Sequence, residues 1–220
     1  MTTATGAERY LPENRSLRSL AAAAETCQGC ALFENATQTV FGHGKAKAPI
    51  MLVGEQPGDQ EDRAGLPFVG PAGRLLARAL GDAGIDPATT YQTNAVKHFK
   101  FTRKGGARRI HQKPSRTEVV ACRPWLLAEI EALRPQVIVC LGATAAQALL
   151  GASFRVTAQR GEPLRLPAAV DVRVASEPVV VATVHPSAVL RDRSDRHDEA
   201  YRAFVDDLRS AREAGMPSAS

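Results

Sequence analysis

Residues 50–74 of this 220-residue chain read IMLVGEQPGDQEDRAGLPFVGPAGR, and this stretch decides the fold. Its first four residues are all apolar and predict a strand buried on both faces, because a half-buried strand would alternate apolar and polar residues. The strand is expected to end at Gly54, since poor strand and helix formers follow. Open α/β sheets bind ligands at the carboxyl ends of their parallel strands. The stretch therefore predicts a parallel sheet with a functional loop after this strand.

The rest of the chain alternates between helical patterns and apolar runs. Strands are predicted at residues 91–96, 136–141 and 179–184, with a shorter one at 37–42 and a hairpin or irregular connection over 154–174. Helices are predicted at residues 14–26, 72–83, 115–133, 142–151 and 195–212. Buried strands that alternate with helices indicate an α/β fold, a three-layer α/β/α sandwich with a mainly parallel central sheet.

Length and composition fit a single domain, with 44% hydrophobic residues to form its core. We expect a flexible N-terminus over residues 1–13, one domain over 14–213 and a disordered tail over 214–220. No run of about 18 apolar residues indicates a membrane span, and the N-terminus lacks the pattern of a signal peptide. We therefore expect a cytoplasmic protein, in which four cysteines indicate metal binding more than disulfides.

The positive charge is concentrated in one segment, residues 97–116, which we call the basic loop. It contains eight Lys or Arg and no acid, and without these eight the chain has 20 basic against 23 acidic residues. Such a patch is typical of proteins that bind phosphate backbones, although a solvated loop has the same composition. A connection of this length inside a compact domain is more often functional than idle.

Polar residues follow three of the predicted strands, where a parallel sheet would gather them at one edge. They are Glu55, Asn94 and the sequence His185-Pro186-Ser187. Together with the Gly-Glu-Gln-Pro-Gly string and Phe68, this order of motifs resembles the uracil-DNA glycosylase superfamily. It is most similar to the iron–sulfur branch, family 4, and to the related UdgX-type proteins. The resemblance extends over residues 27–190.

The resemblance implies excision of uracil from DNA, the first step of base-excision repair. The base must leave the stack and enter a pocket, where Phe68 is expected to stack on it and Asn94 to read its edge. Cleavage passes through an oxocarbenium-like state and leaves negative charge on the uracil, which His185 and Asn94 could stabilise. Glu55 would favour the cationic sugar or activate a nucleophile. The expected substrate-binding residues are Gln56, Asp59, Phe68 and Asn94.

Three cysteines match the family pattern for a [4Fe–4S] cluster: the pair Cys27 and Cys30, and Cys122. The position of the remaining family cysteine holds His98. Either His98 or Cys140 is the fourth ligand, or the site is incomplete. Cys140 lies within a buried apolar strand and is expected to pack as a small apolar residue, so we favour His98. A set of three cysteines and one histidine also suits zinc, the less favoured alternative.

Within the basic loop, Arg108-Arg109-Ile110-His111 matches four residues of the Lys-Arg-Arg-Ile-His loop of the UdgX-type proteins, with Ala107 at the first position. The resemblance implies that His111 attacks the sugar C1′ after uracil leaves, so that the protein stays covalently joined to the abasic site. Histidine is nucleophilic only when neutral, and a carboxylate such as Glu55 could orient its ring. The expected DNA contacts are Lys97, Arg108, Arg109 and Ser187.

Our leading hypothesis is a self-crosslinking uracil-DNA glycosylase with catalytic residues Glu55, His111 and His185. The alternatives are a conventional family 4 enzyme that turns over, and a metal-containing DNA-binding module without activity. We expect a monomer that acts on uracil-containing DNA, single-stranded rather than duplex, and makes no membrane contact; protein partners are unknown from the sequence.

Overall fold

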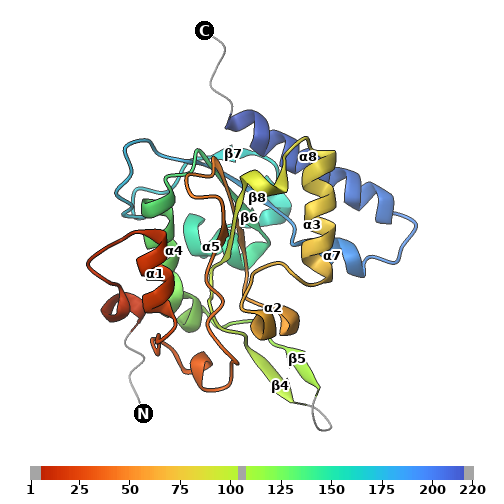
Figure 1. Ribbon diagram of the computed structural model, residues 1–220. Helices are drawn as coiled ribbons and strands as arrows, with labels where there is room; N and C mark the ends of the chain where they lie inside the picture. Colours follow the sequence, from red (N-terminus) through yellow and green to blue (C-terminus); the bar gives the residue numbers. More distant parts are fainter. Residues whose placement is uncertain (1–5, 104–107, 216–220) are drawn as a thin grey trace.

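The structure is a computed structural model that describes residues 6–103 and 108–215, so Ala107 lies outside the described residues. Its centre is a six-stranded sheet whose four middle strands are parallel and whose two edge strands are antiparallel (Figure 1). In order across the sheet the strands are β1 (His43–Gly44), β3 (Tyr91–Asn94), β2 (Ile50–Gly54), β6 (Val137–Leu141), β8 (Val179–Thr183) and β7 (Pro163–Leu164).

Helices cover both faces of the sheet, which confirms the predicted three-layer sandwich (Figure 1). One layer contains α1 (Leu17–Ala24), α4 (Arg116–Leu133) and α5 (Ala143–Leu150), and the other contains α3 (Pro71–Asp82), α7 (Pro186–Arg191) and α8 (His197–Ala214). The short elements are η1 (Ala7–Tyr10), η2 (Ala31–Glu34), α2 (Asp59–Ala64), η3 (Pro87–Thr89) and α6 (Val156–Gln159).

Strand β2 has the continuous burial that its sequence predicts. Met51 and Val53 pack in the core that includes α4, whereas Ile50 and Leu52 pack on the opposite face against α3 and α8. Alternate side chains of a strand point to opposite faces, so a strand covered on both sides must be apolar at every position. Among the described residues, none of the helices has the length and apolarity needed to cross a membrane.

The predicted start of α4 is confirmed in detail. The Ser115 hydroxyl accepts from the Glu118 backbone N–H at 3.3 Å, and the Glu118 carboxylate accepts from the Ser115 N–H at 2.6 Å. This capping box satisfies two N–H groups that an uncapped helix would leave unpaired. It fixes where the basic loop ends.

Some predicted boundaries were wrong. The segment 37–42 is not a strand, and the short strand β1 follows it. Part of the N-terminus that we expected to be flexible forms η1, in which Ala7 is buried against the body of the protein. The basic loop contains an antiparallel hairpin, β4 (Phe101–Arg103) with β5 (Arg109–His111), which projects from the body (Figure 1).

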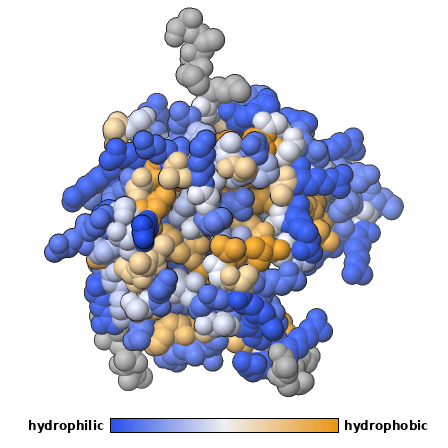
Figure 2. All heavy atoms as spheres, viewed as in Figure 1, coloured by the Kyte–Doolittle hydropathy of each residue, from blue (hydrophilic) through white to orange (hydrophobic). Residues whose placement is uncertain are grey.

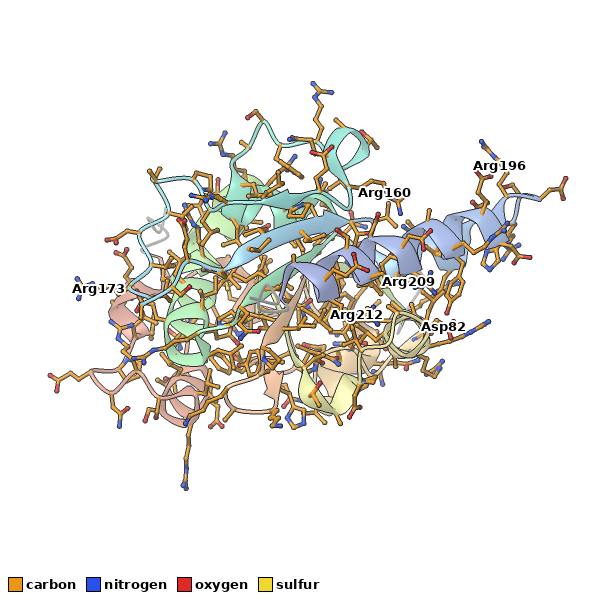
Figure 3. The ribbon with its side chains drawn as sticks, turned by 90° about the horizontal axis from the view of Figure 1, so that it is seen from above. Asp82, Arg160, Arg173, Arg196, Arg209 and Arg212 are labelled. Atoms are coloured by element: carbon orange, nitrogen blue, oxygen red, sulfur yellow. The ribbon has the colours of Figure 1, made fainter. Side chains whose placement is uncertain are left out.

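Helix α8 closes the second layer and holds the neighbouring elements. Arg209 donates to the backbone oxygen of Asp82 at the end of α3, at 3.0 Å (Figure 3). Asp207 accepts from Arg160 at 2.8 Å and also from the hydroxyl of Thr183, the last residue of β8. Because the predicted histidine motif begins two residues later, these contacts fix the strand end that carries it.

Candidate active site at the carboxyl edge of the sheet

Three predicted site residues meet at the carboxyl edge of the sheet. Glu55 follows β2, Asn94 ends the adjacent strand β3, and His185 follows β8. Gly54 and Asn94 are register partners, so the Asn94 amide lies beside the start of the Glu55 loop. This arrangement confirms the expected convergence, because parallel strands present their carboxyl ends on one side.

Gly54 separates the Asn94 amide from the Phe68 ring. A Cβ atom at this position would lie 2.3 Å from Asn94 Oδ1 and 2.8 Å from Phe68 Cζ, closer than side chains approach in proteins. Only glycine therefore allows the amide and the ring to face the same small space. The sequence pattern predicts Gly54 only as the end of a strand; a glycine directly before the polar loop is the signal for this close approach.

Phe68 has a backbone conformation that L residues rarely adopt, with φ at 56°. Gly73 on α3 stabilises this turn, because a Cβ at Gly73 would lie 1.7 Å from the Phe68 carbonyl oxygen. The first turn of α3 thus packs on the Phe68 backbone and leaves the half-buried ring directed at Gly54. Non-glycine residues with positive φ often occur at functional sites.

The local hydrogen bonds of His185 determine its tautomer. Its Nδ1 accepts from the Ser187 backbone N–H at 3.2 Å, so the proton of the neutral ring is on Nε2. Burial lowers the pKa of His185 to about 4, and the nearby His111 and Arg191 lower it as well. At neutral pH this residue is a neutral N–H donor, the form suited to stabilise negative charge without losing a proton.

The hairpin brings His111 to this edge of the sheet. His111 Nε2 lies 3.5 Å from Glu55 Oε1, and the other oxygen of Glu55 accepts from the Thr144 hydroxyl. The His111 side chain is half exposed, so a DNA strand can reach it. Long contacts of this kind between catalytic groups commonly tighten when substrate binds.

Arg109 attaches the hairpin to α2. Its guanidinium pairs with the Asp59 carboxylate and, at 2.6 Å, with Asp62. It also lies over the ring of Phe101, 5.0 Å from the centroid. Only 7% of the Arg109 side chain is exposed. The predictions that Arg109 contacts DNA and that Asp59 binds substrate do not fit this geometry, because the two side chains bind each other.

Two further predicted contacts need correction. Gln56 is buried, and its side-chain amide forms hydrogen bonds with backbone groups of Lys100 and Gln112 in the hairpin stem, at 2.9–3.2 Å. It therefore holds the hairpin in place, whereas the sequence predicted that it binds substrate. Lys97 is 1% exposed and pairs with the buried Glu129. It cannot reach a DNA phosphate from the core. Arg108 is exposed, as a contact with DNA requires. Ser187 lies next to His185, with its hydroxyl 2.8 Å from His185 Nδ1.

Three of the predicted metal ligands lie in the same buried cluster, between α1 and α4: Cys27, Cys30 and Cys122. Within residues 6–103 and 108–215, no group of three potential ligands has the arrangement of a formed metal site. Burial, assisted by the neighbouring Cys27 and Cys30, raises the pKa of Cys122 to about 12. The Trp125 indole donates to Cys27 Sγ and the Lys97 backbone N–H to Cys122 Sγ, both at 3.2 Å. N–H donors to sulfur stabilise thiolates that ligate metals.

The fourth candidate ligand has a defined tautomer. The Thr39 hydroxyl donates its one hydrogen to the Ala24 carbonyl at 2.9 Å. The same hydroxyl lies 2.9 Å from His98 Nε2, and since its hydrogen is already used, it must accept a hydrogen bond there. The proton of the neutral ring is then on Nε2, which leaves the lone pair of Nδ1 available to a metal. Cys140 has no such neighbours: burial alone raises its pKa to about 12. The three cysteines thus have thiol chemistry suited to a metal, and the tautomer of His98 leaves Nδ1 free to act as a further ligand.

Comparison with known proteins gives a consistent result. A family profile described as the uracil DNA glycosylase superfamily matches residues 41–209. A type-4 uracil-DNA glycosylase of Thermotoga maritima is 37% identical over 187 residues, which is 84% of this chain and 88% of the relative. Enzymes of the same description from Pyrobaculum aerophilum and Archaeoglobus fulgidus are 37% and 36% identical over 76% and 75% of this chain, which correspond to 81% and 78% of the relatives.

Proposed function

Because the chain belongs to the uracil DNA glycosylase superfamily, we propose that it excises uracil from DNA and then binds the abasic product covalently through His111. The observation that carries the second part is the hairpin, which places His111 Nε2 3.5 Å from Glu55 Oε1. This contact brings the loop histidine to the carboxylate that follows β2. The Arg-Arg-Ile-His string resembles the loop of the UdgX-type proteins and supports the same assignment.

The excision step uses the pocket around Gly54. The flipped uracil stacks on Phe68 and pairs with the Asn94 amide, which offers both a donor and an acceptor to the base edge. The N-glycosidic bond breaks, and its electron pair leaves on the uracil. His185 is neutral with its proton on Nε2 and donates to the negative charge that develops. Glu55 stabilises the cationic sugar.

The covalent step follows at C1′. A ring nitrogen of neutral His111 forms a bond to this carbon with its lone pair, and the imidazole becomes positively charged. The ring then loses its remaining N–H proton, which Glu55 is placed to accept, and the departed uracil anion takes up a proton from water. The product is a neutral alkylated imidazole attached to the sugar. No regeneration step follows, so each molecule reacts once.

The DNA strand would approach along the hairpin. Exposed Arg103 and Arg108 lie at its strand ends, and Figure 2 shows mostly hydrophilic side chains around it. A half-exposed His111 on the projecting hairpin suits a single strand, whose sugar can turn toward the site without opening of a duplex. We propose that the protein acts as a monomer on single-stranded DNA that contains uracil.

We also propose that Cys27, Cys30, His98 and Cys122 hold a [4Fe–4S] cluster, with zinc as the less favoured group. The cluster would be structural and would hold α1, α4 and the start of the basic loop together. Protein purified without oxygen is expected to contain iron and sulfide. Cys122→Ala should lose both, whereas Cys140→Ala, the matched buried control, should retain them. Wild-type protein that contains neither would contradict the assignment.

A denaturing gel tests the main proposal. The protein is incubated with a labelled uracil-containing single strand, boiled in detergent and compared with a thymine strand and with His111→Ser. A slow band with uracil only, absent in His111→Ser, is the expected result. Free alkali-labile abasic DNA from the wild type would indicate a conventional enzyme that turns over. Intact uracil would leave the alternative of a DNA-binding module without activity. A parallel reaction with duplex measures the strand preference.

A further inference from the structure

Thr144 contacts the carboxylate at the centre of the site, although no sequence pattern marks it as a site residue. Its hydroxyl donates to Glu55 Oε2, while the other oxygen, Oε1, lies 3.5 Å from His111 Nε2. Thr144 is 6% exposed and is the second residue of α5. The two oxygens of Glu55 therefore have different partners: one is held by the protein core and the other faces the proposed nucleophile.

The sheet topology produces this contact. Strands β2 and β6 are parallel neighbours with Val53 opposite Cys140, so the loop after β2 lies beside the turn that starts α5. Gly142 makes that turn with φ at +95°, and a Cβ there would lie 3.1 Å from His185 Cβ. The Gly142 N–H donates to the Thr183 carbonyl at 2.8 Å. The turn is thus fixed between Glu55 and the histidine motif.

The contact with Thr144 also brings the Glu55 carboxylate to the N-terminus of α5. The first N–H groups of a helix lack partners inside the helix and give its N-terminus a partial positive charge. The Thr144 side chain adds a directional hydrogen bond to this general effect. A free carboxylate could rotate about its last bond, whereas one held at Oε2 keeps Oε1 in a defined direction.

We propose that Thr144 is a positioning residue for the covalent step: it holds the Glu55 carboxylate so that Oε1 receives the proton of His111. The inference rests on the proposed function. Thr144 itself forms and breaks no covalent bond. It fixes the acceptor for the N–H proton that the imidazole must lose once its other nitrogen has bonded to C1′.

The two roles of Glu55 depend differently on this contact. Its charge stabilises the cationic sugar from any rotamer that remains in the site, because Coulomb interaction varies slowly with direction. Acceptance of a proton requires a short and directed hydrogen bond. Loss of the Thr144 hydroxyl should therefore slow conjugate formation more than uracil release. Molecules whose uracil has been released but whose sugar has not been captured would end as free abasic DNA.

The test measures how product divides between conjugate and free abasic DNA in single-turnover reactions with a uracil-containing single strand. Thr144→Val retains the shape and removes the hydroxyl, and should lower the ratio of conjugate to free abasic product about tenfold. Thr144→Ser should restore the wild-type ratio. Thr157→Val is the matched control, since Thr157 is the second residue of α6 and is exposed. It should leave the ratio unchanged.

The ratio counts only molecules that have reacted, so a variant that folds poorly does not alter it. An unchanged ratio in Thr144→Val, or a Thr144→Ser variant that behaves like Thr144→Val, would overturn the inference while the proposed function stands. Absence of conjugate with the wild type would overturn both. Uracil release, measured in the same samples, separates that result from a protein without glycosylase activity.

Discussion

Small residues and hydrogen-bond directions determine what the site can do at the scale of single residues. Gly54 makes room between the Asn94 amide and the Phe68 ring, and the Ser187 N–H determines which nitrogen of His185 is protonated. Neither effect comes from a residue with reactive chemistry of its own. Both follow from backbone positions that contact the Asn94, Phe68 and His185 side chains.

Gly54→Ala should damage base recognition without unfolding the protein. The added methyl would meet the Asn94 amide and the Phe68 ring, so one of the two must move out of the pocket. We expect uracil release to slow at least tenfold, since a misplaced amide loses a hydrogen bond to the base. Single-turnover rates over a range of DNA concentrations measure this. Gly81→Ala is the control, because nothing lies within 4 Å of its Cβ position. Equal rates for both variants would contradict the prediction.

The half-buried His185 should make stability depend on pH. Its pKa falls from 6.5 to about 4 on folding, so both states are neutral above pH 6.5. As the pH decreases toward 4, His185 becomes protonated in the unfolded chain but stays neutral in the folded protein. The free energy of unfolding therefore decreases. Between pH 7 and pH 5 the loss due to this residue is about 2 kcal/mol. Urea unfolding of wild type and His185→Asn at both pH values measures it. His43→Asn, an exposed control, should keep the wild-type dependence, and a His185→Asn variant that also keeps it would refute the assignment.

At the scale of elements, the β4–β5 hairpin is an attached arm and not a loose basic loop. Gln56 holds its stem, Arg109 holds its second strand to α2, and Lys100 pairs with Glu118 on α4 at 2.9 Å. Three of the eight basic residues that suggested a DNA footprint are therefore used inside the protein: Lys97, Lys100 and Arg109. Lys100 and Arg109 attach the arm that carries His111 to the body of the protein.

Arg109→Lys should uncouple the arm from α2. A lysine keeps the charge but lacks the planar guanidinium, which pairs with Asp59 and Asp62 through different nitrogens while it lies over the Phe101 ring. We expect conjugate formation to fall about tenfold, with a smaller change in uracil release, because His111 is no longer held near Glu55. Quantified gel bands and released uracil give the two rates. Arg108 is the exposed neighbour, and Arg108→Lys should retain conjugate formation. Equal losses of conjugate in both variants would mean that the contacts of Arg109 with Asp59 and Asp62 have no role in it.

Across the whole molecule, a buried polar network connects the cysteine region to Asn94 at the end of β3. Lys97 Nζ pairs with Glu129 on α4 and donates to the Asn94 carbonyl at 2.8 Å, while its backbone N–H donates to Cys122 Sγ at 3.2 Å. Tyr91 and Thr93 also donate to Glu129. The network connects α4 to β3, and the side chains of its ion pair, Lys97 and Glu129, are both fully buried.

Removal of one partner of this network should cost more than removal of both. Lys97→Met leaves the buried Glu129 without its counter-charge and should lower the free energy of unfolding by about 3–5 kcal/mol. The double variant Lys97→Met, Glu129→Leu leaves no buried charge and should recover part of that loss. Urea unfolding provides the comparison, with exposed Lys113→Met as control. A double variant less stable than Lys97→Met would show that the stability loss comes from the missing ion pair and not from burial of a lone Glu129 charge.

The sequence by itself determined the three layers, the parallel sheet, the caps of α4 and the edge where Glu55, Asn94 and His185 meet. These follow from local patterns: unbroken apolar runs, helical periodicity and polar residues at strand ends. Only the tertiary structure decided the partner of each charged side chain. Lys97, Arg109, Asp59 and Gln56 look like ligand contacts in the sequence, but they bind other parts of the chain. Thr144 and Gly54 show no reactive chemistry in the sequence, yet both touch the site. The reason is physical: a pattern reports which side of an element is buried, whereas a salt bridge or a close approach depends on residues distant in the chain that only packing brings together.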